Sequence, residues 1–396
     1  MTAPEPNKTP KVAVVGAGLT GMLAAHGLKK NGFDVVIFDS EKHIDARPRD
    51  WTIVLHWAMP TFSKLLPESV IANLDTAICN PRLDFTPEVE CLPCLNGVTG
   101  DLMFKSPMPG SRRVSRQRLR KVLSEGLDVQ WDKKLVDLSS TPDHVTLSFA
   151  DGSTVQADFV LGTDGPSSAV RSLLFHDDPK ASIVPSGYYL ATAIMQHGDA
   201  AKVEPVHNSH PVATIVMGTS SVGGIGTMYT PSPSLSTWSV FWVKIFRRGA
   251  FPDPPARYGL EALRYLKETT KDLVEPFQSQ IDWAKEDDTT TCFIDEMKTW
   301  TPALGFDTHG GRVTLAGDAA HPMLPYRGQG FQHAVVDADL FVEALKAGQG
   351  LDGYNAEMVE RGAKAVAQSL REAELSMDLE GVKKMMMARQ GHGKSA

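Results

Sequence analysis

The sequence contains little cysteine and lacks an unbroken apolar run long enough to cross a membrane. Four cysteines in 396 residues are too few for a disulfide framework. The apolar stretch 12–25 is interrupted by three glycines and a threonine, and the lead before it, 1–11, contains a glutamate and three prolines. This pattern fits neither a signal peptide nor a transmembrane helix. The C-terminal residues suggest no membrane anchor, so we expect a soluble, cytoplasmic protein that does not bind a membrane.

An excess of positive charge is also missing. The formal net charge is −7 and the isoelectric point is about 6.0, so no overall field favours nucleic acid or an anionic membrane. Cys91 and Cys94 have the spacing of a redox motif, but no second cysteine pair and no thioredoxin-like pattern accompany them. We interpret them as partly buried thiols in a reducing compartment and predict no metal site.

What is present is an ordinary globular composition, with 42% hydrophobic and 22% charged residues. A chain of 396 residues is long enough for two domains, or for one large domain with an insertion.

The first strong motif lies near the N-terminus. A β-branched run at 11–15 predicts a buried strand, and it leads directly into a Gly-x-Gly-x-x-Gly turn, a helical segment at 22–31 and a second strand at 34–38. The motif consists of Gly16, Gly18 and Gly21, with Asp39 at the end of the second strand. Such a unit binds the pyrophosphate of an adenine dinucleotide at the helix N-terminus and the ribose at the acid. The motif alone leaves FAD and NAD both open.

Two later motifs favour FAD. Asp164-Gly165 follows a predicted strand at 158–162, and Gly317-Asp318 follows another at 312–316. Ligands in open α/β sheets bind at the carboxyl ends of such strands. Asp318 could accept a hydrogen bond from a ribityl chain. The helix that begins at 328–330, with Gly-Gln-Gly, would present amides and a positive dipole end to a reduced flavin.

These motifs, in this order, resemble the single-component, FAD-dependent aromatic hydroxylases and their fungal natural-product relatives, the group A flavoprotein monooxygenases with the para-hydroxybenzoate hydroxylase fold. The segment from Val114 to Leu119 adds to the resemblance, because the family usually has an arginine there that contacts FAD. The matches span 11 to about 345. The resemblance implies an α/β fold: a Rossmann-like FAD-binding domain, an inserted antiparallel-sheet substrate domain and C-terminal helices.

The resemblance also implies site residues. Arg116 would contact the pyrophosphate or ribityl region, and Asp164 would connect FAD to the transient NAD(P)H site with support from Arg171. Arg49 could meet cofactor phosphates or be an ordinary surface arginine. The remaining cofactor-binding residues are Gly16, Gly18, Gly21 and Asp39 for the ADP half, Asp318 for the ribityl chain, and Pro325, Gly328, Gln329, Gly330 and Phe331 around the isoalloxazine ring.

Some residues depart from the family pattern. The acid after the second strand is Asp39 rather than the commoner Glu, and Phe331 replaces a smaller residue, which would narrow the flavin pocket. Some fungal members carry a catalytic arginine on the first substrate-domain strand, but 187–192 contains none. The catalytic acid or base is therefore unassigned. We interpret His321 as a structural residue of its turn.

The predicted domains are discontinuous. The FAD-binding domain is expected at 8–75, 105–180 and 290–350, the substrate domain at 76–104 and 181–289, and a C-terminal helical segment at 351–396. The predicted strands of 181–290 are rich in aromatics, of which half or more would be core and the rest would line an apolar pocket.

The leading hypothesis is a monooxygenase of secondary metabolism with non-covalent FAD, NAD(P)H as transient co-substrate, and O2. It would insert one oxygen atom into an aromatic or polycyclic small molecule by hydroxylation or epoxidation, with Baeyer–Villiger insertion also open. The alternatives are a FAD-dependent dehydrogenase or oxidase, and a flavoprotein that acts as a non-redox cyclisation scaffold. The sequence does not choose the oligomeric state, NADH or NADPH, or the substrate.

Overall fold

The N-terminal strand–helix–strand unit forms where the sequence pattern predicts it in the computed structural model, which describes residues 9–217, 220–271, 273–391 and 393. Strand β1 (Lys11–Val15), helix α1 (Leu19–Lys30) and strand β2 (Asp34–Phe38) follow one another, and the two strands pair in parallel. All but the first residue of β1 is buried, because layers cover the sheet on both faces. Our expectations for residues 1–8 and 394–396 lie outside the described residues.

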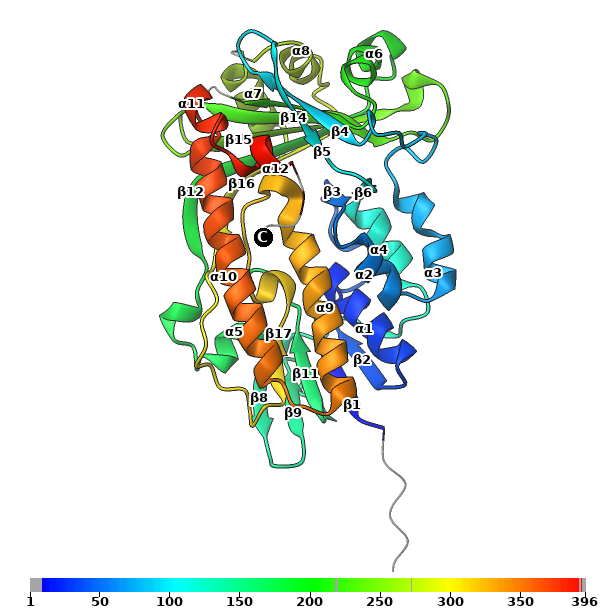
Figure 1. Cartoon of the computed structure of the whole chain (residues 1–396), viewed down its shortest axis with the longest axis vertical. Coiled ribbons are helices and arrows are strands. Elements are labelled where there is room, and N and C mark those ends of the chain that lie inside the picture. The colour runs from blue at the N-terminus through cyan, green and yellow to red at the C-terminus, as the bar shows by residue number, and fades with distance from the viewer. Residues whose placement is uncertain (1–8, 218–219, 272, 392, 394–396) are drawn as a thin grey trace, which may run out of the picture.

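A parallel sheet forms the lower half of the molecule in Figure 1. Its strand order is β17-β11-β1-β2-β7. Helix α1 packs against α9 (Gln329–Ala347) and α4 (Arg116–Ser124), and α10 (Asp352–Leu375) packs along α9. The other strands of this sheet are β17 (Val313–Leu315), β11 (Phe159–Gly162) and β7 (Val129–Gln130).

Two small sheets and three short helices complete this half. A three-stranded antiparallel sheet precedes β11, and a two-stranded sheet joins β3 to β6 just before α4. The bounds are β8 (Leu135–Ser140), β9 (Val145–Phe149), β10 (Thr154–Ala157), β3 (Thr52–Leu55), β6 (Arg112–Ser115), α2 (Met59–Leu65), α3 (Glu68–Ala72) and α5 (Ala169–Leu174).

A seven-stranded sheet lies across the other end of the molecule (Figure 1). Its order is β16-β12-β15-β14-β13-β4-β5, and its neighbours are antiparallel except for the β13–β4 pair. Its outer face is covered by α7 and α8, and Trp242 and Phe246 are buried there. The bounds are β4 (Cys91–Asn96), β5 (Leu102–Pro107), β12 (Val184–Met195), β13 (Ala213–Met217), β14 (Ser221–Tyr229), β15 (Ser239–Arg247), β16 (Thr290–Thr299), α6 (Ala200–Ser209), α7 (Leu260–Thr269) and α8 (Phe277–Asp282).

The sheet pairing changes two of the expected domain boundaries. We assigned 290–299 to the FAD-binding part, but these residues form β16 and pair with β12 along most of its length. Strand β5 likewise extends to Pro107, beyond the expected limit at 104. Both strands occupy edges of the large sheet, and their partners are decided by long-range pairing that no local pattern encodes. The substrate domain we now propose comprises about 76–107 and 181–299.

The C-terminal segment is helical but not continuous. Helix α10 ends at Leu375, and two short helices follow, α11 (Leu379–Val382) and α12 (Met386–Gln390). The Asp378 carboxylate accepts a hydrogen bond from the Gly381 amide at 2.7 Å, and a Cβ at Gly381 would lie 2.2 Å from the Leu375 carbonyl oxygen. This tight turn redirects the chain between α10 and the two short helices, and the expected C-terminal segment is helical as described. Among the described residues, no helix has both the length and the apolar character needed to cross a bilayer.

Candidate active site

Four of the predicted site residues lie at the same edge of the parallel sheet. Asp318 follows β17, Asp164 follows β11, the glycine turn from Gly16 follows β1, and Asp39 follows β2. These strands are neighbours and run in the same direction, so their carboxyl ends meet. This is the edge at which open α/β sheets bind ligands.

The three glycines of the first turn have different surroundings. A Cβ on Gly16, whose φ is +107°, would lie 2.5 Å from the Thr163 carbonyl oxygen, and one on Gly21 would lie 2.1 Å from the Gly16 carbonyl oxygen. Those two positions therefore exclude any side chain within the protein itself. A Cβ on Gly18 would meet only the Thr163 carbonyl oxygen, at 3.9 Å. The space beside Gly18 is thus left open at the N-terminus of α1, as close approach of a phosphate requires.

Asp39 is already engaged by the backbone. One carboxylate oxygen accepts from the Ala17 amide at 2.7 Å and the other from the Glu41 amide at 2.8 Å. Arg120 lies 3.6 Å from the same carboxylate and donates to the Ala17 carbonyl at 2.9 Å. Asp39 therefore fixes the glycine turn, and any contact with a ribose would use its remaining lone pairs.

Arg116 and Asp318 come from distant parts of the chain and influence each other electrostatically. Arg116 is half-buried at the start of α4 and lies 4.6 Å from the Trp51 ring. Within the part of the chain that the structure describes, its guanidinium has no hydrogen-bond acceptor and Asp318 has no donor. The Asp318 carboxylate is reachable by solvent although protein surrounds it on most sides. A cation and an anion that form no hydrogen bond among the described residues, close to a glycine turn, suit a ligand with both phosphates and hydroxyls.

The electrostatic environment supports this interpretation. Desolvation, together with repulsion from Arg120 and Arg47, lowers the pKa of Arg116 to about 10. A bound polyanion would relieve that repulsion. Desolvation also raises the pKa of Asp318, although Arg116 opposes the shift. Both groups are thus less stable as ions here than in water, and pyrophosphate oxygens and ribityl hydroxyls would supply the missing partners. The donors and acceptors present fit FAD.

Asp164 caps a helix. Its carboxylate accepts from the Ser168 hydroxyl at 2.5 Å and from the Ala169 and Val170 amides at 2.7 and 3.1 Å, at the start of α5. Arg171 supports the loop as expected, because its guanidinium donates to the Pro166 carbonyl at 2.5 Å and to the Ala319 carbonyl at 2.8 Å. Arg171 thereby connects the Asp164 loop to the Asp318 loop. A contact of Asp164 with NAD(P)H stays a prediction.

The segment from Pro325 to Gly330 precedes and begins α9. Gly328 has a left-handed backbone, with φ of +59°, and its carbonyl accepts from His56 at 3.2 Å. The Gln329 side chain accepts from the Trp57 indole at 3.0 Å. The N-terminal end of α9 therefore lies beside β3, and β3 pairs with β6, the strand that leads into α4 and Arg116.

Two of the predicted residues, Phe331 and Arg49, contact other side chains of the protein. The Phe331 ring lies 6.1 Å from the Phe62 ring and packs against the core of the FAD-binding half, and its contact with the flavin ring stays a prediction. Arg49 forms an ion pair with Asp295 of β16 and lies 5.0 Å from the Trp51 ring, which Arg116 also contacts. Arg47 interacts electrostatically with Asp39 and Arg116.

A buried charge network below the Asp318 loop was missed. Asp337 of α9 is fully buried and accepts from the Gly317 amide at 2.7 Å, from His321 at 2.7 Å and from Arg361 at 2.6 Å. Burial opposes ionisation of Asp337, but His321 and Arg361 hold its pKa well below the usual range. His321 is therefore part of the scaffold, in agreement with its expected structural role. The available signal was an acid within the apolar helix segment 334–342.

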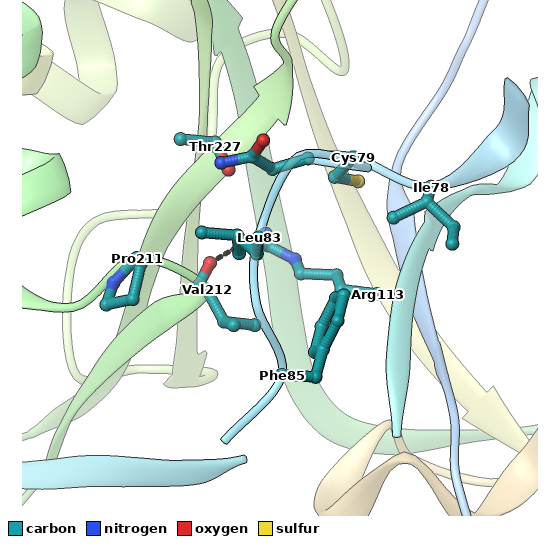
Figure 2. A pocket seen from close by; sticks show the side chains of 9 residues that line it. Ile78, Cys79, Leu83, Phe85, Arg113, Pro211, Val212 and Thr227 are labelled. Carbon is teal, nitrogen blue, oxygen red and sulfur yellow. Dashed lines mark hydrogen bonds between the residues drawn. The ribbon is translucent and has the colours of Figure 1, made fainter. Parts of the chain in front are cut away.

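The inner face of the large sheet meets the FAD-binding half. Arg49 lies 5.2 Å from the Phe293 ring, and Arg113 lies 5.2 Å from the Phe241 ring. Figure 2 shows Arg113 extending beside Phe85 toward the Val212 carbonyl, to which it donates at 2.8 Å. The pocket drawn there has a volume of about 10 Å³, room for about one water, so it is not a substrate pocket.

A second pocket of about 490 Å³ lies away from these motifs. It is formed by the segment after α5 and by the loop 300–307. It contains none of the predicted site residues. Within the described ranges, no group of three or more His, Cys, Asp or Glu side chains is placed to hold a metal ion.

Comparisons with known proteins give one consistent picture. Residues 113–369 match the FAD binding domain family, and residues 14–65 match the NAD(P)-binding Rossmann-like domain. The chain is 30% identical to the FAD-dependent monooxygenase phnB of Penicillium herquei, over 99% of this chain and 96% of that protein.

Solved structures have the same fold. HpxO of Klebsiella pneumoniae, complexed with FAD and uric acid, matches with a TM-score of 0.73 at 19% identity, over 95% of this chain and 91% of that one. A salicylate hydroxylase substrate complex matches with a TM-score of 0.74 at 19% identity, over 96% and 94%. The α/β architecture with an added sheet domain is thereby confirmed.

Proposed function

This chain belongs to the FAD binding domain family and is a FAD-dependent monooxygenase, and on that premise we propose that it oxygenates an aromatic or polycyclic natural product between the α9 N-terminus and the inner face of the large sheet. NAD(P)H is the reductant, and O2 supplies the inserted oxygen atom. The observation that carries the placement is the pair Arg116 and Asp318, a cation and an anion whose side chains form no hydrogen bond within the described part of the chain, near the open flank of Gly18.

The ADP half of FAD would lie along the glycine turn. The α1 N-terminus and Arg116 would bind the pyrophosphate, because both offer N–H donors and positive charge to it. Asp318 would accept from ribityl hydroxyls, and Asp39 would keep the turn in shape through the Ala17 amide. The backbone of 328–330 would border the flavin ring at the start of α9.

When bound, FAD supplies the redox chemistry by taking two electrons from NAD(P)H and activating O2. The protein's part is to orient rings and to exclude water. The α9 amides would stabilise negative charge on the ring, and the fully buried Asp337 fixes the loop that carries Asp318 through the Gly317 amide. None of the described residues is assigned as a catalytic acid or base.

The substrate would contact the inner face of the large sheet. Leu190, Ile194 and Val243 are only partly buried, and the register pairs Leu190 with Asp295 and Ile194 with Phe241 on that face. Phe293 is also half-buried and lies under Arg49. Apolar and aromatic surface with few charges suits a ring-containing substrate. phnB is named a FAD-dependent monooxygenase, and the salicylate hydroxylase complex involves an aromatic acid.

A single set of assays tests the proposal. Purified protein is reconstituted with FAD, and NADH and NADPH oxidation are followed with a panel of aromatic polyketides under ¹⁸O2. Incorporation of one ¹⁸O atom per product supports the proposal. Substrate oxidation without incorporation would instead indicate a dehydrogenase or oxidase, and turnover without NAD(P)H would indicate a cyclisation scaffold.

We further propose a cytoplasmic location. It rests on the four cysteines, which are all free thiols in the structure, because disulfides are rare in that compartment.

A further inference from the structure

The end of the chain is tied to the segment that precedes α9. Arg327 is buried, with 3% of its surface exposed, and its guanidinium donates to the Gly391 carbonyl at 3.1 Å and to the Gly393 carbonyl at 2.7 Å. It also contacts the Met386 thioether. We name residues 385–391 with Gly393 the C-terminal strap. Figure 1 shows α12 of this strap close to the start of α9 and below the large sheet.

The backbone of Arg327 is itself unusual. Its φ is +58° and ψ is +11°, a left-handed conformation that non-glycine residues adopt only when their surroundings require it. Gly328, which follows, is left-handed as well. The interactions of the Arg327 side chain with the strap help to stabilise this turn, together with the Gln329 side-chain amide, which donates to the Arg327 carbonyl at 3.1 Å.

Helix α10 holds the same segment from a second side. The Leu324 amide donates to the Ser369 hydroxyl at 3.2 Å, and the Tyr326 and Ser376 hydroxyls bond at 2.9 Å. The strap in turn is fixed by buried Glu372 of α10, which accepts from the Met386 amide at 2.8 Å. Residues 324–328 are thus positioned by the C-terminal part of the chain.

The strap also contacts the substrate domain. Met385 and Met387 belong to one apolar cluster with Leu324 and Tyr326 of the segment before α9. The cluster includes residues from the inner face of the large sheet, which are Tyr188, Met217, Val222, Ile245 and Met297. A Cβ on Gly391 would lie 2.8 Å from Pro107 at the end of β5, so the strap packs closely on that edge. It therefore joins the cofactor half to the substrate half.

We propose that the C-terminal strap is a positioning element of the oxygenation site, which through Arg327 holds 325–328 against the place of the flavin ring. This inference rests on the proposed function, from which it takes that residues 325–328 face the flavin ring. Arg327 acts as a positioning residue, because it touches the strap rather than a reacting atom. When the segment is displaced, electrons from NAD(P)H reach O2 without substrate oxygenation: NAD(P)H, H⁺ and O2 give NAD(P)⁺ and H2O2.

Four variants test the proposal: a truncation, two single substitutions, and the truncation combined with Arg327→Lys. Truncation after Met385 removes the acceptors of Arg327, and Arg327→Lys keeps the charge but loses the planar fork. Arg389→Gln is the matched control, because Arg389 is exposed on α12 of the same strap. FAD affinity is measured by titrating apoprotein, and coupling is measured as product formed and H2O2 released per NAD(P)H.

The truncation should weaken FAD binding and coupling each by about tenfold, because small displacements beside reacting groups cost that much or more. Arg327→Lys should shift both quantities in the same direction, and the combined variant should be no worse than the truncation alone, since both remove the same contacts. Arg389→Gln should match the parent. A lower melting temperature with unchanged FAD affinity and coupling overturns the proposal.

The test is decisive even if the truncated chain does not fold or the parent incorporates no oxygen. If the truncated chain does not fold, Arg327→Lys is judged by the same two measurements, and parent-like values reject the positioning role. If the parent incorporates no oxygen into any substrate, the proposed function fails, while the FAD titrations still decide whether the strap positions the flavin segment.

Discussion

The buried network at Asp337 makes the sharpest prediction about how this site is held together. Asp337→Asn keeps the shape of the side chain but removes the charge that faces His321, Arg361 and the Gly317 amide. Removing one partner of a buried ion pair costs about 3–5 kcal/mol, because the other charge stays buried. We expect the free energy of unfolding to fall by that amount. We also expect the Asp318 loop to lose the hydrogen bond between the Gly317 amide and the Asp337 carboxylate.

The expected shift in melting temperature follows from chain length. An unfolding entropy of ~2.1 cal/mol/K per residue gives ~0.8 kcal/mol/K for 396 residues, so the predicted loss corresponds to about 4–6 °C. The measurement is a thermal melt of the apoprotein with and without FAD. The FAD-induced increase in melting temperature should shrink as well, because Gly317 and Asp318 are adjacent.

Asp339→Asn is the matched control. Asp339 lies two residues away on α9 and pairs at 2.7 Å with Lys64, which is 54% exposed, so its loss should cost under about 1 kcal/mol. An Asp337→Asn protein that melts within about 1 °C of the parent and retains its response to FAD would refute the reasoning, since the change predicted from the entropy scale is several times larger.

Three further predictions concern the same edge of the sheet. Gly18→Ala should leave the stability of the apoprotein unchanged, because its Cβ meets only one atom at 3.9 Å, yet weaken FAD binding measured by titration; equal binding would mean that no phosphate approaches there. Asp318→Ala should lower FAD affinity about tenfold or more, because a charged hydrogen bond is worth about 1.5–3 kcal/mol, and a parent-like dissociation constant would contradict the ribityl role. The pKa of Asp337 is lowered in the folded state, so its contribution is full above the unfolded value of about 3.9 and is lost as pH falls further. The difference in melting temperature between parent and Asp337→Asn should therefore shrink as pH falls from about 5 to below about 4, and a difference that grows over this interval would reverse the assigned sign.

The sequence alone determined the nucleotide-binding half of the fold. The strand bounds Lys11–Val15 and Asp34–Phe38 were predicted to the residue, because a glycine turn between β-branched runs permits few other structures. The motifs at Asp164 and Asp318 also lie where expected, at strand ends. These are local signals, in which residue type and spacing fix the backbone directly. The FAD family followed from the resemblance that these motifs carry, and the monooxygenase class was the leading hypothesis that this resemblance implied.

Tertiary structure decided everything that depends on remote pairing. The place of 290–299 in the large sheet came from its register with β12, and the direction of Phe331 and Arg49 came from packing against Phe62 and Asp295. The anchoring of the chain end by Arg327 joins residues 64 positions apart. Such contacts depend on which surfaces meet after the chain has folded, and the spacing of residues along the sequence carries no record of that.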